Sequence, residues 1–540
     1  MRRVSNSALV CWVVAITSLS ARAQDVDLPP RAQAVVDSAI APAMEQIPGD
    51  PLGLDEAVLQ AMAQAPRLEI ARAATDVARA TVRSAQGDFD PELFARAERR
   101  SDDQPSASFF AGADVLETRS TEAEAGARMT LPLGTEISAS LSTLRTETNS
   151  AFAALDPQID TVADLSLRQP LLDGLGDGTR STLAAAERSL EAAHARADDV
   201  RLVVAADVER VYWELFAAGR DFAVQEAIVA QAEAVLDEAR TRREAGLVGP
   251  AAVANARVFL SEQQQTRLDR LESMGILSDR LASLIGRRPG DESGLFRPID
   301  VPPEEFSLRP VDDLVEEAAA RNFTLRALER EVAGWDERVA GARRNTLPTL
   351  DLLAGLGGRG LGGDARPVEF NDEVFTTAVD GGFGETFEQA LTGDYPNWRV
   401  GLSLELPLGN ARDGGELDRL QAERVRAVQN LEVARRDLEE RIRAQHRVLQ
   451  HGAERLAAAR DGVDAANEQV RIGVLEFQNG RTTAFELVRL GADLTRAQQR
   501  FSSALVRTAQ ATAQLRRLLG GTSPVGSISP TPSDAPREDR

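Results

Sequence analysis

The sequence predicts a mainly α-helical protein with membrane β-strands, built as two structural repeats. Three observations predict this fold class. Helix and strand landmarks recur in the same order in both halves of the chain. Two helical patterns run for about 67 residues each, whereas the mean helix has about 11–12. Two regions alternate apolar and polar residues in segments of about ten residues, which is typical of strands that cross a membrane.

The chain begins with a predicted signal peptide, residues 1–23. Arg2 and Arg3 make a short basic start, Ala8–Leu19 is an apolar run, and Ala21–Ala23 reads as an A-x-A cleavage site. The apolar run is too short to cross a bilayer as a helix. We therefore expect an exported protein.

The composition excludes several classes of function. Asp and Glu number 84 against 62 Lys and Arg, and the chain has no Lys. An acidic surface repels phosphate backbones, so no nucleic acid is expected as a partner. Loss of the signal peptide would take the formal charge from −22 to −25 and remove Cys11, the only cysteine. The mature chain would then have no disulfide and no thiolate nucleophile.

An internal repeat organises the rest of the chain. Helical patterns open at Leu54–Val58 and again at Val311–Val315, and each leads to an x-Pro-x-Leu step, at Asp90–Leu93 and Leu347–Leu350. All these landmarks keep one offset of 257 residues. Such spacing predicts two copies of one structural unit.

The strand regions alternate cleanly. In Val400–Leu406 and in Ala123–Leu131 every second residue is apolar, so each strand has one apolar and one polar face. A soluble sheet with one wet face would alternate too, but the length of the segments favours a membrane barrel. The first region is longer than the second, from either an extra hairpin turning at Leu131–Thr135 or a longer outer loop.

Two very long helices follow the strand regions, over about 179–245 and 412–479, and shorter helices return over about 250–286 and 481–519. At a rise of 1.5 Å per residue, about 67 residues make a rod of roughly 100 Å. Rods with such partners suit a coiled-coil tunnel. A cytoskeletal or stalk coiled coil is the alternative, but it does not explain strands at matching points of both halves.

The predicted organisation follows from these patterns. A signal peptide at 1–23 is followed by an N-terminal extension at 24–51. Repeat 1 covers 52–290, with strands at about 89–171 and a hairpin tip at 246–249, and a linker follows at 291–308. Repeat 2 covers 309–520, with strands at about 347–408 and a tip near 480, and a disordered tail is predicted at 521–540.

The chemical motifs are weak. Gly355–Gly360 fits G-x-G-x-x-G, but a dinucleotide site needs a helix next, and Leu361–Pro367 reads as a loop. His194, His446 and His451 lack metal-site spacing and read as surface residues on helices. We expect no catalytic residues, no cofactor and no metal, and hence no enzyme.

At this point the residues resemble the TolC-like outer-membrane efflux family over about 52–520. The resemblance rests on the strand end Leu167–Leu172, the long-helix segment Asp207–Leu215 and the tip Gly246–Gly249, in the family's order. It implies a homotrimer in which one outer-membrane β-barrel continues as a long periplasmic α-helical coiled-coil barrel. The barrel would lie in outer-membrane lipid.

The family resemblance also implies a function and partners. Such a protein is the passive outer-membrane channel of a tripartite efflux or type I secretion system, coupled through a periplasmic adaptor (membrane fusion) protein to an inner-membrane pump. A soluble periplasmic coiled-coil adaptor or stalk is the alternative. An adaptor would have one hairpin flanked by small β domains, whereas this chain has two hairpins and two strand regions.

The resemblance assigns candidate sites to the hairpin ends. The adaptor-docking tips would be Arg243, Gly246, Leu247, Phe477, Gly480 and Arg481; the simpler interpretation is that the glycines only end helices. The periplasmic aperture would involve Glu486, but the next acidic position of the family falls on Arg489, and the first hairpin has Ala252 at its acidic position. Arg489 could pair with Glu486 and weaken a cation-selective ring. Glu486 could equally be an ordinary solvated helix residue.

The aromatic girdle expected of a membrane barrel is thin here, because the chain has only two Tyr and four Trp. The aromatic residues near the strands that could serve are Phe89, Phe94, Phe109, Phe110, Phe370, Phe375, Phe383, Phe387, Tyr395 and Trp398.

Overall fold

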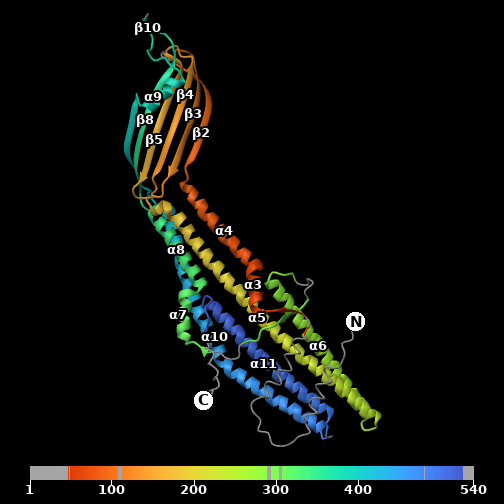
Figure 1. Ribbon diagram of the computed structural model, residues 1–540. Coiled ribbons are helices and arrows are strands. Elements are labelled where there is room, and N and C mark those ends of the chain that lie inside the picture. Colours follow the sequence, from red (N-terminus) through yellow and green to blue (C-terminus); the bar gives the residue numbers. More distant parts are fainter. Residues whose placement is uncertain are drawn as a thin grey trace, which may run out of the picture.

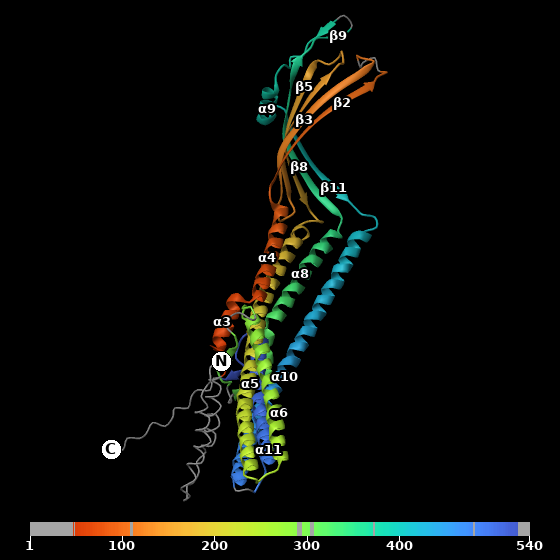
Figure 2. The same ribbon diagram turned by 90° about the vertical axis from the view of Figure 1, so that its right-hand side faces the viewer.

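The structure, a computed structural model, is elongated, with a β-sheet at one end and long helices running away from it (Figure 1). It describes residues 47, 49–107, 112–288, 294–302, 307–370, 373–478 and 481–526. Figure 2 shows the sheet and the helices in line along one axis. Among the described residues, no helix combines the length and apolarity that crossing a membrane requires. The predicted signal peptide and Phe109 and Phe110 lie outside the described residues.

The two halves repeat the same helices. α3 (Leu54–Gln64) and α7 (Val311–Arg321) have 11 residues each, and α4 (Pro66–Gln86) and α8 (Phe323–Asn345) follow them directly. Pro66 takes the first position of α4, where its missing N–H costs nothing. In the second half Asn322 instead caps α8, because its side chain accepts a hydrogen bond of 3.0 Å from Leu325 N–H.

The long helices of the two halves have equal lengths. α5 (Asp177–Glu244) and α10 (Ala411–Gln478) both have 68 residues, and the returning helices α6 (Pro250–Leu284) and α11 (Ala484–Leu518) both have 35. Each long helix therefore spans roughly 100 Å. The four helices lie side by side in both views, as the predicted rods require (Figures 1 and 2).

Six antiparallel strands make the large sheet, in the order β11-β8-β5-β4-β3-β2. Their bounds are β2 Glu92–Pro105, β3 Val115–Thr130, β4 Glu136–Thr148, β5 Leu155–Pro170, β8 Thr349–Ala365 and β11 Pro396–Glu405. The first half supplies four strands and the second half two, so the longer first region holds an extra hairpin. The chain reverses between β3 and β4 at Gly134, whose φ of +87° suits glycine.

The register places apolar side chains on one face of the sheet. Leu165 pairs with Leu356, which in turn pairs with Trp398. Ion pairs lie on the opposite face, including Arg399 with Asp164 at 3.1 Å and Arg128 with Glu92 at 2.7 Å. Arg168 on that face bridges Glu136 at 3.0 Å and Asp351 at 2.7 Å. The predicted division into an apolar and a polar face is confirmed.

The loop predicted at Leu361–Pro367 is wrong, because β8 continues to Ala365. The glycines that suggested a loop instead leave room for a short helix, α9 (Phe383–Thr392), on the apolar face. A Cβ at Gly362 would lie 2.7 Å from the side chain of Thr386 in that helix. These glycines are therefore packing positions within a strand.

Two small sheets involve residues of the predicted extension, linker and tail. β1 (Asp50–Leu52) pairs in parallel with β6 (Phe296–Pro298), and β7 (Ser307–Leu308) pairs with β12 (Val525–Gly526). The tail predicted to be disordered from residue 521 is thus ordered to Gly526, because it adds a strand to the linker. Residues 527–540 lie outside the described part. At the far end of the sheet, β9 (Val368–Phe370) and β10 (Glu373–Phe375) form a hairpin.

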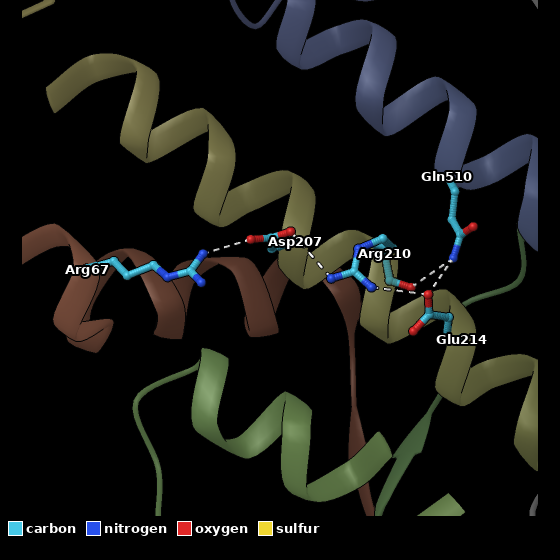
Figure 3. Close-up of polar contacts among 5 residues, drawn as sticks. All are labelled: Arg67, Asp207, Arg210, Glu214 and Gln510. Atoms are coloured by element: carbon cyan, nitrogen blue, oxygen red, sulfur yellow. Dashed lines mark hydrogen bonds and ion pairs between the residues drawn. The ribbon is translucent and has the colours of Figure 1, made fainter. Parts of the chain in front are cut away.

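Polar contacts join the two repeats where the helices meet. Asp207 of α5 binds Arg67 of α4 at 2.9 Å and Arg210 at 3.4 Å. Arg210 also binds Glu214 at 3.2 Å, and the Gln510 amide of α11 donates to Glu214 at 3.1 Å (Figure 3). This chain of contacts fixes the first long helix against the returning helix of the second repeat.

A buried tyrosine fastens the small sheet to the long helix. The Tyr212 hydroxyl lies 2.9 Å from the Leu52 carbonyl and 2.8 Å from the Asp300 carboxylate, and it accepts from Ile299 N–H at 3.2 Å. Burial raises the pKa of Tyr212, so the hydroxyl keeps its proton. Its ring packs in the core with Leu215 and its neighbours.

Tyr212→Phe should lower the free energy of unfolding by about 1–3 kcal/mol, because it leaves buried polar groups without their partner. The chain's other tyrosine provides a matched control, since Tyr395 is 61% exposed. Tyr395→Phe should leave stability unchanged. Denaturant titration of the two variants measures both effects, and equal stabilities would contradict this role of the hydroxyl.

Candidate functional site: the helical hairpin tips

The first hairpin tip is a helix end closed by glycine. Gly246 has φ +74° and directly follows the last residues of α5. Its N–H donates to Arg243 O at 2.9 Å, and Leu247 N–H donates to Arg242 O at 2.8 Å, so the last carbonyls of the helix are satisfied. This backbone pattern is a Schellman motif, which ends a helix and reverses the chain in a few residues.

The reversal leaves an exposed apolar residue at the bottom of the molecule. Leu247 is 74% exposed, and Arg243 is exposed beside it. A Cβ on Gly246 would meet no atom within 4 Å, so only its backbone angle demands glycine. α6 then begins at Pro250, a residue suited to the first helical position. The tip is therefore a tight, hydrogen-bonded reversal that is open on its outer side.

The second tip also has a backbone hydrogen bond across its reversal, but a side chain caps its returning helix. α10 includes Phe477 in its last turn, and Arg481 N–H donates to Glu476 O at 2.8 Å across the reversal. Gly480 lies outside the described residues. Thr483 caps α11, because its hydroxyl accepts from Glu486 N–H at 3.4 Å. Arg481 is exposed, as Arg243 is on the first tip.

The two aperture candidates form an ion pair. The Arg489 Nε donates to a Glu486 carboxylate oxygen at 3.1 Å, and a second guanidinium nitrogen contacts the same oxygen. The carboxylate holds the pKa of Arg489 above its usual range, so the arginine stays charged. Both side chains are partly open to solvent. The structure thus brings together the two residues whose pairing the sequence suggested.

A second ion pair continues the same helix face. Asp493 and Arg496 contact each other one heptad beyond Glu486 and Arg489. Positions seven residues apart lie on one face of a helix, so the two pairs make a stripe along the first turns of α11. Asp493 and Arg496 were not predicted as site residues, although their spacing in the sequence marks them. The stripe alternates in sign and carries no net charge.

The comparisons with known proteins agree with this architecture. A family model described as outer membrane efflux protein matches residues 135–287 and 314–521. The fusaric acid resistance protein FusA of Burkholderia cepacia is 28% identical over 241 residues, which cover 43% of this chain and 39% of that protein. The match thus spans well under half of that relative.

Solved structures share the fold over most of the chain. The outer-membrane channel OprN has a TM-score of 0.62 at 17% identity, covering 93% of this chain and 99% of its own. The outer membrane protein VceC of Vibrio cholerae has a TM-score of 0.61 at 18% identity, covering 87% and 96%. The family model matches well over half of the residues, and the chain therefore belongs to the outer membrane efflux protein family.

Proposed function

We propose that the protein is the outer-membrane channel of a tripartite efflux system, a passive duct through the periplasm and the outer membrane. One observation carries this function. A sheet with one apolar and one charged face continues directly into helices of roughly 100 Å. The apolar face suits lipid, the charged face suits a water-filled lumen, and the helices suit a tunnel.

Closure of the lumen requires further copies of the chain. β2 and β11 form the edges of the sheet, and each has one side without a strand partner among the described residues. Because the six strands alternate in direction, β2 of one copy runs antiparallel to β11 of the next. We infer a homotrimer from the family resemblance; its three six-stranded sheets would make a closed barrel of eighteen strands.

The hairpin tips lie at the end of the molecule opposite the sheet (Figure 1). In the proposed channel they face the periplasm, where a periplasmic adaptor protein would dock and connect the duct to an inner-membrane pump. Leu247 offers an apolar contact, and Arg243 and Arg481 offer charges on the two tips. Energy for transport would come from the pump, so the channel itself needs no catalytic group.

The membrane placement is tested by fractionation. Expressed with its signal peptide, the protein should be recovered from outer-membrane fractions and migrate in gels as a trimer that dissociates on heating, because barrel strands of different copies share hydrogen bonds. Recovery of a soluble monomer from the periplasmic extract would contradict the channel and favour the adaptor interpretation.

Ion selectivity tests the aperture. Arg489→Ala leaves Glu486 without its cation in each copy, so the single-channel reversal potential in a salt gradient should shift toward cation preference. Glu486→Ala leaves Arg489 alone and should shift the potential toward anions. Arg489→Lys keeps the charge and should behave like the natural protein. Unchanged potentials in both alanine variants would remove this pair from the pore.

Adaptor docking is tested at the first tip. Leu247→Ala removes the exposed apolar side chain without touching the backbone of the reversal, so it should reduce chemical cross-linking to the adaptor and raise drug sensitivity of the cells. Leu268→Ala is the control, because Leu268 is also exposed but lies within α6, away from the tip. Equal loss of cross-linking in both variants would argue against docking at Leu247.

A further inference from the structure

The short helix α9 lies against one face of the sheet (Figures 1 and 2). This is the apolar face, opposite the face that carries the ion pairs. It packs on β8 and β5 through the apolar face, where glycines of β8 let it approach closely. A Cβ at Gly358 would lie 2.1 Å from Ala390 O, and one at Gly360 would lie 2.0 Å from Thr386 O. The strand is therefore shaped to seat this helix.

Polar contacts hold α9 beside the part of β8 that extends beyond the end of β11. β11 begins opposite Gly358, so the edge of β8 beyond that point has no strand beside it. Leu361 N–H there donates to the Gln389 side chain at 3.0 Å, and Gly363 N–H donates to Gly381 O at 2.8 Å. The segment that carries α9 thus satisfies backbone groups that could find no water in lipid.

A third contact buries the middle of α9. The Thr386 hydroxyl lies 2.9 Å from the hydroxyl of Thr161 on β5, and both residues are fully buried. Such a contact between hydroxyls orients the helix on the sheet and leaves its other side free. The orientation of α9 is therefore fixed by its polar contacts and by the glycines below it.

One flank of α9 is apolar, whereas Glu385 and Glu388 are exposed on the side farther from the sheet. Phe383 is 51% exposed and Leu391 60% exposed, and the half-buried Phe387 lies between them at a spacing of four residues. Residues four apart share one side of a helix, so the three form a stripe along the flank of α9, beside the buried Thr386 and Ala390. Tyr395 and Trp398, also exposed, extend it along the chain.

A shallow hollow of about 560 Å³ lies on the sheet beside the C-terminal end of α9. Small side chains on the strands make its floor, and Ala390 and Leu391 of the helix make one wall. The apolar residues of the floor are Ala125, Ala139, Leu141, Ala163, Leu165 and Leu356. These residues belong to β3, β4, β5 and β8, and Pro396 at the start of the edge strand β11 completes the lining on one side.

We propose that α9 and this hollow form a binding site for the acyl chain of a membrane lipid. The proposal rests on the membrane placement proposed above. The hollow is continuous with the exposed apolar face of Val400, Leu402 and Leu404, which would contact the same lipid. A neighbouring copy is a poor occupant, because copies would meet at β2 and β11 and not above β3 to β8. An acyl chain fills an apolar hollow without leaving polar groups unsatisfied.

Short-range quenching tests lipid contact. Because the mature chain would have no other cysteine, single cysteines at Leu391, Leu402 and Ser142 carry a fluorescent label. The trimer is placed in phosphatidylcholine vesicles with a nitroxide-labelled lipid as quencher. Leu402 lies on the apolar face away from α9, and Ser142 on the charged face. Labels at Leu391 and Leu402 should lose emission alike, and the label at Ser142 should keep it.

The outcomes separate the two proposals. Quenching at Leu402 without quenching at Leu391 would overturn the lipid site while leaving the barrel in the membrane. Absence of quenching at both positions would overturn the membrane placement itself. Quenching at both, with Ser142 protected, supports the site.

Filling the hollow tests retention of a bound lipid. Ala163→Phe places a ring on the floor, so native mass spectra of the phosphatidylcholine-treated trimer should show fewer retained lipids than the natural protein. Ala354→Phe is the control, because Ala354 lies on the same face but does not line the hollow. If Ala163→Phe does not assemble, Ala163→Leu makes the same test with a smaller side chain. Equal lipid retention in the assembled variants and the control would contradict the site.

Discussion

The N–H and C=O groups that point outward from β2 and β11 have no strand partner within the described chain. In lipid an open sheet edge is too costly to persist, because each unsatisfied backbone group costs several kcal/mol. Every other feature of the proposed channel depends on how these edges are satisfied. Pairing β2 with β11 of the next copy closes the lumen, and α9 covers the one stretch of β8 that β11 is too short to reach.

The repeat explains how one chain supplies both the sheet and the tunnel. Each half brings its strands between a short helix pair and a long hairpin, and the long helices of both halves have equal lengths. The extra hairpin of β3 and β4 enlarges the sheet without altering the helices, because β3 begins and β4 finishes at the same end of the sheet, away from the helices. The polar chain from Arg67 to Gln510 then joins the two halves, and the Tyr212 contacts tie the segment around Asp300 to the first long helix.

Much of this architecture could be predicted from the sequence. The offset of 257 residues, the long helical patterns and the alternation in Val400–Leu406 predicted the repeats, the rods and the two-faced sheet, and the family that they indicated is confirmed. The strand count stayed open, because a turn such as Leu131–Thr135 fits a hairpin and an outer loop equally well. Only strand pairing decides between them.

The errors have one physical cause. The residues around a position in the sequence do not reveal which distant segments of the chain pack against it. Leu361–Pro367 read as a loop because nothing nearby in the chain indicates the helix that packs above Gly362. The short strand at Val525–Gly526 was missed because its partner lies more than 200 residues away. In contrast, the pairing of Glu486 with Arg489 is local to one helix turn, and the sequence suggested it correctly.

The most direct test of the account is an image of the assembled protein in lipid nanodiscs by electron cryomicroscopy, at a resolution that separates strands. For the proposed channel we expect a closed ring of three six-stranded sheets, with β2 of each copy hydrogen-bonded to β11 of its neighbour and α9 on the outer side. A sheet that stays open, or a ring in which β2 and β11 do not meet, would contradict it.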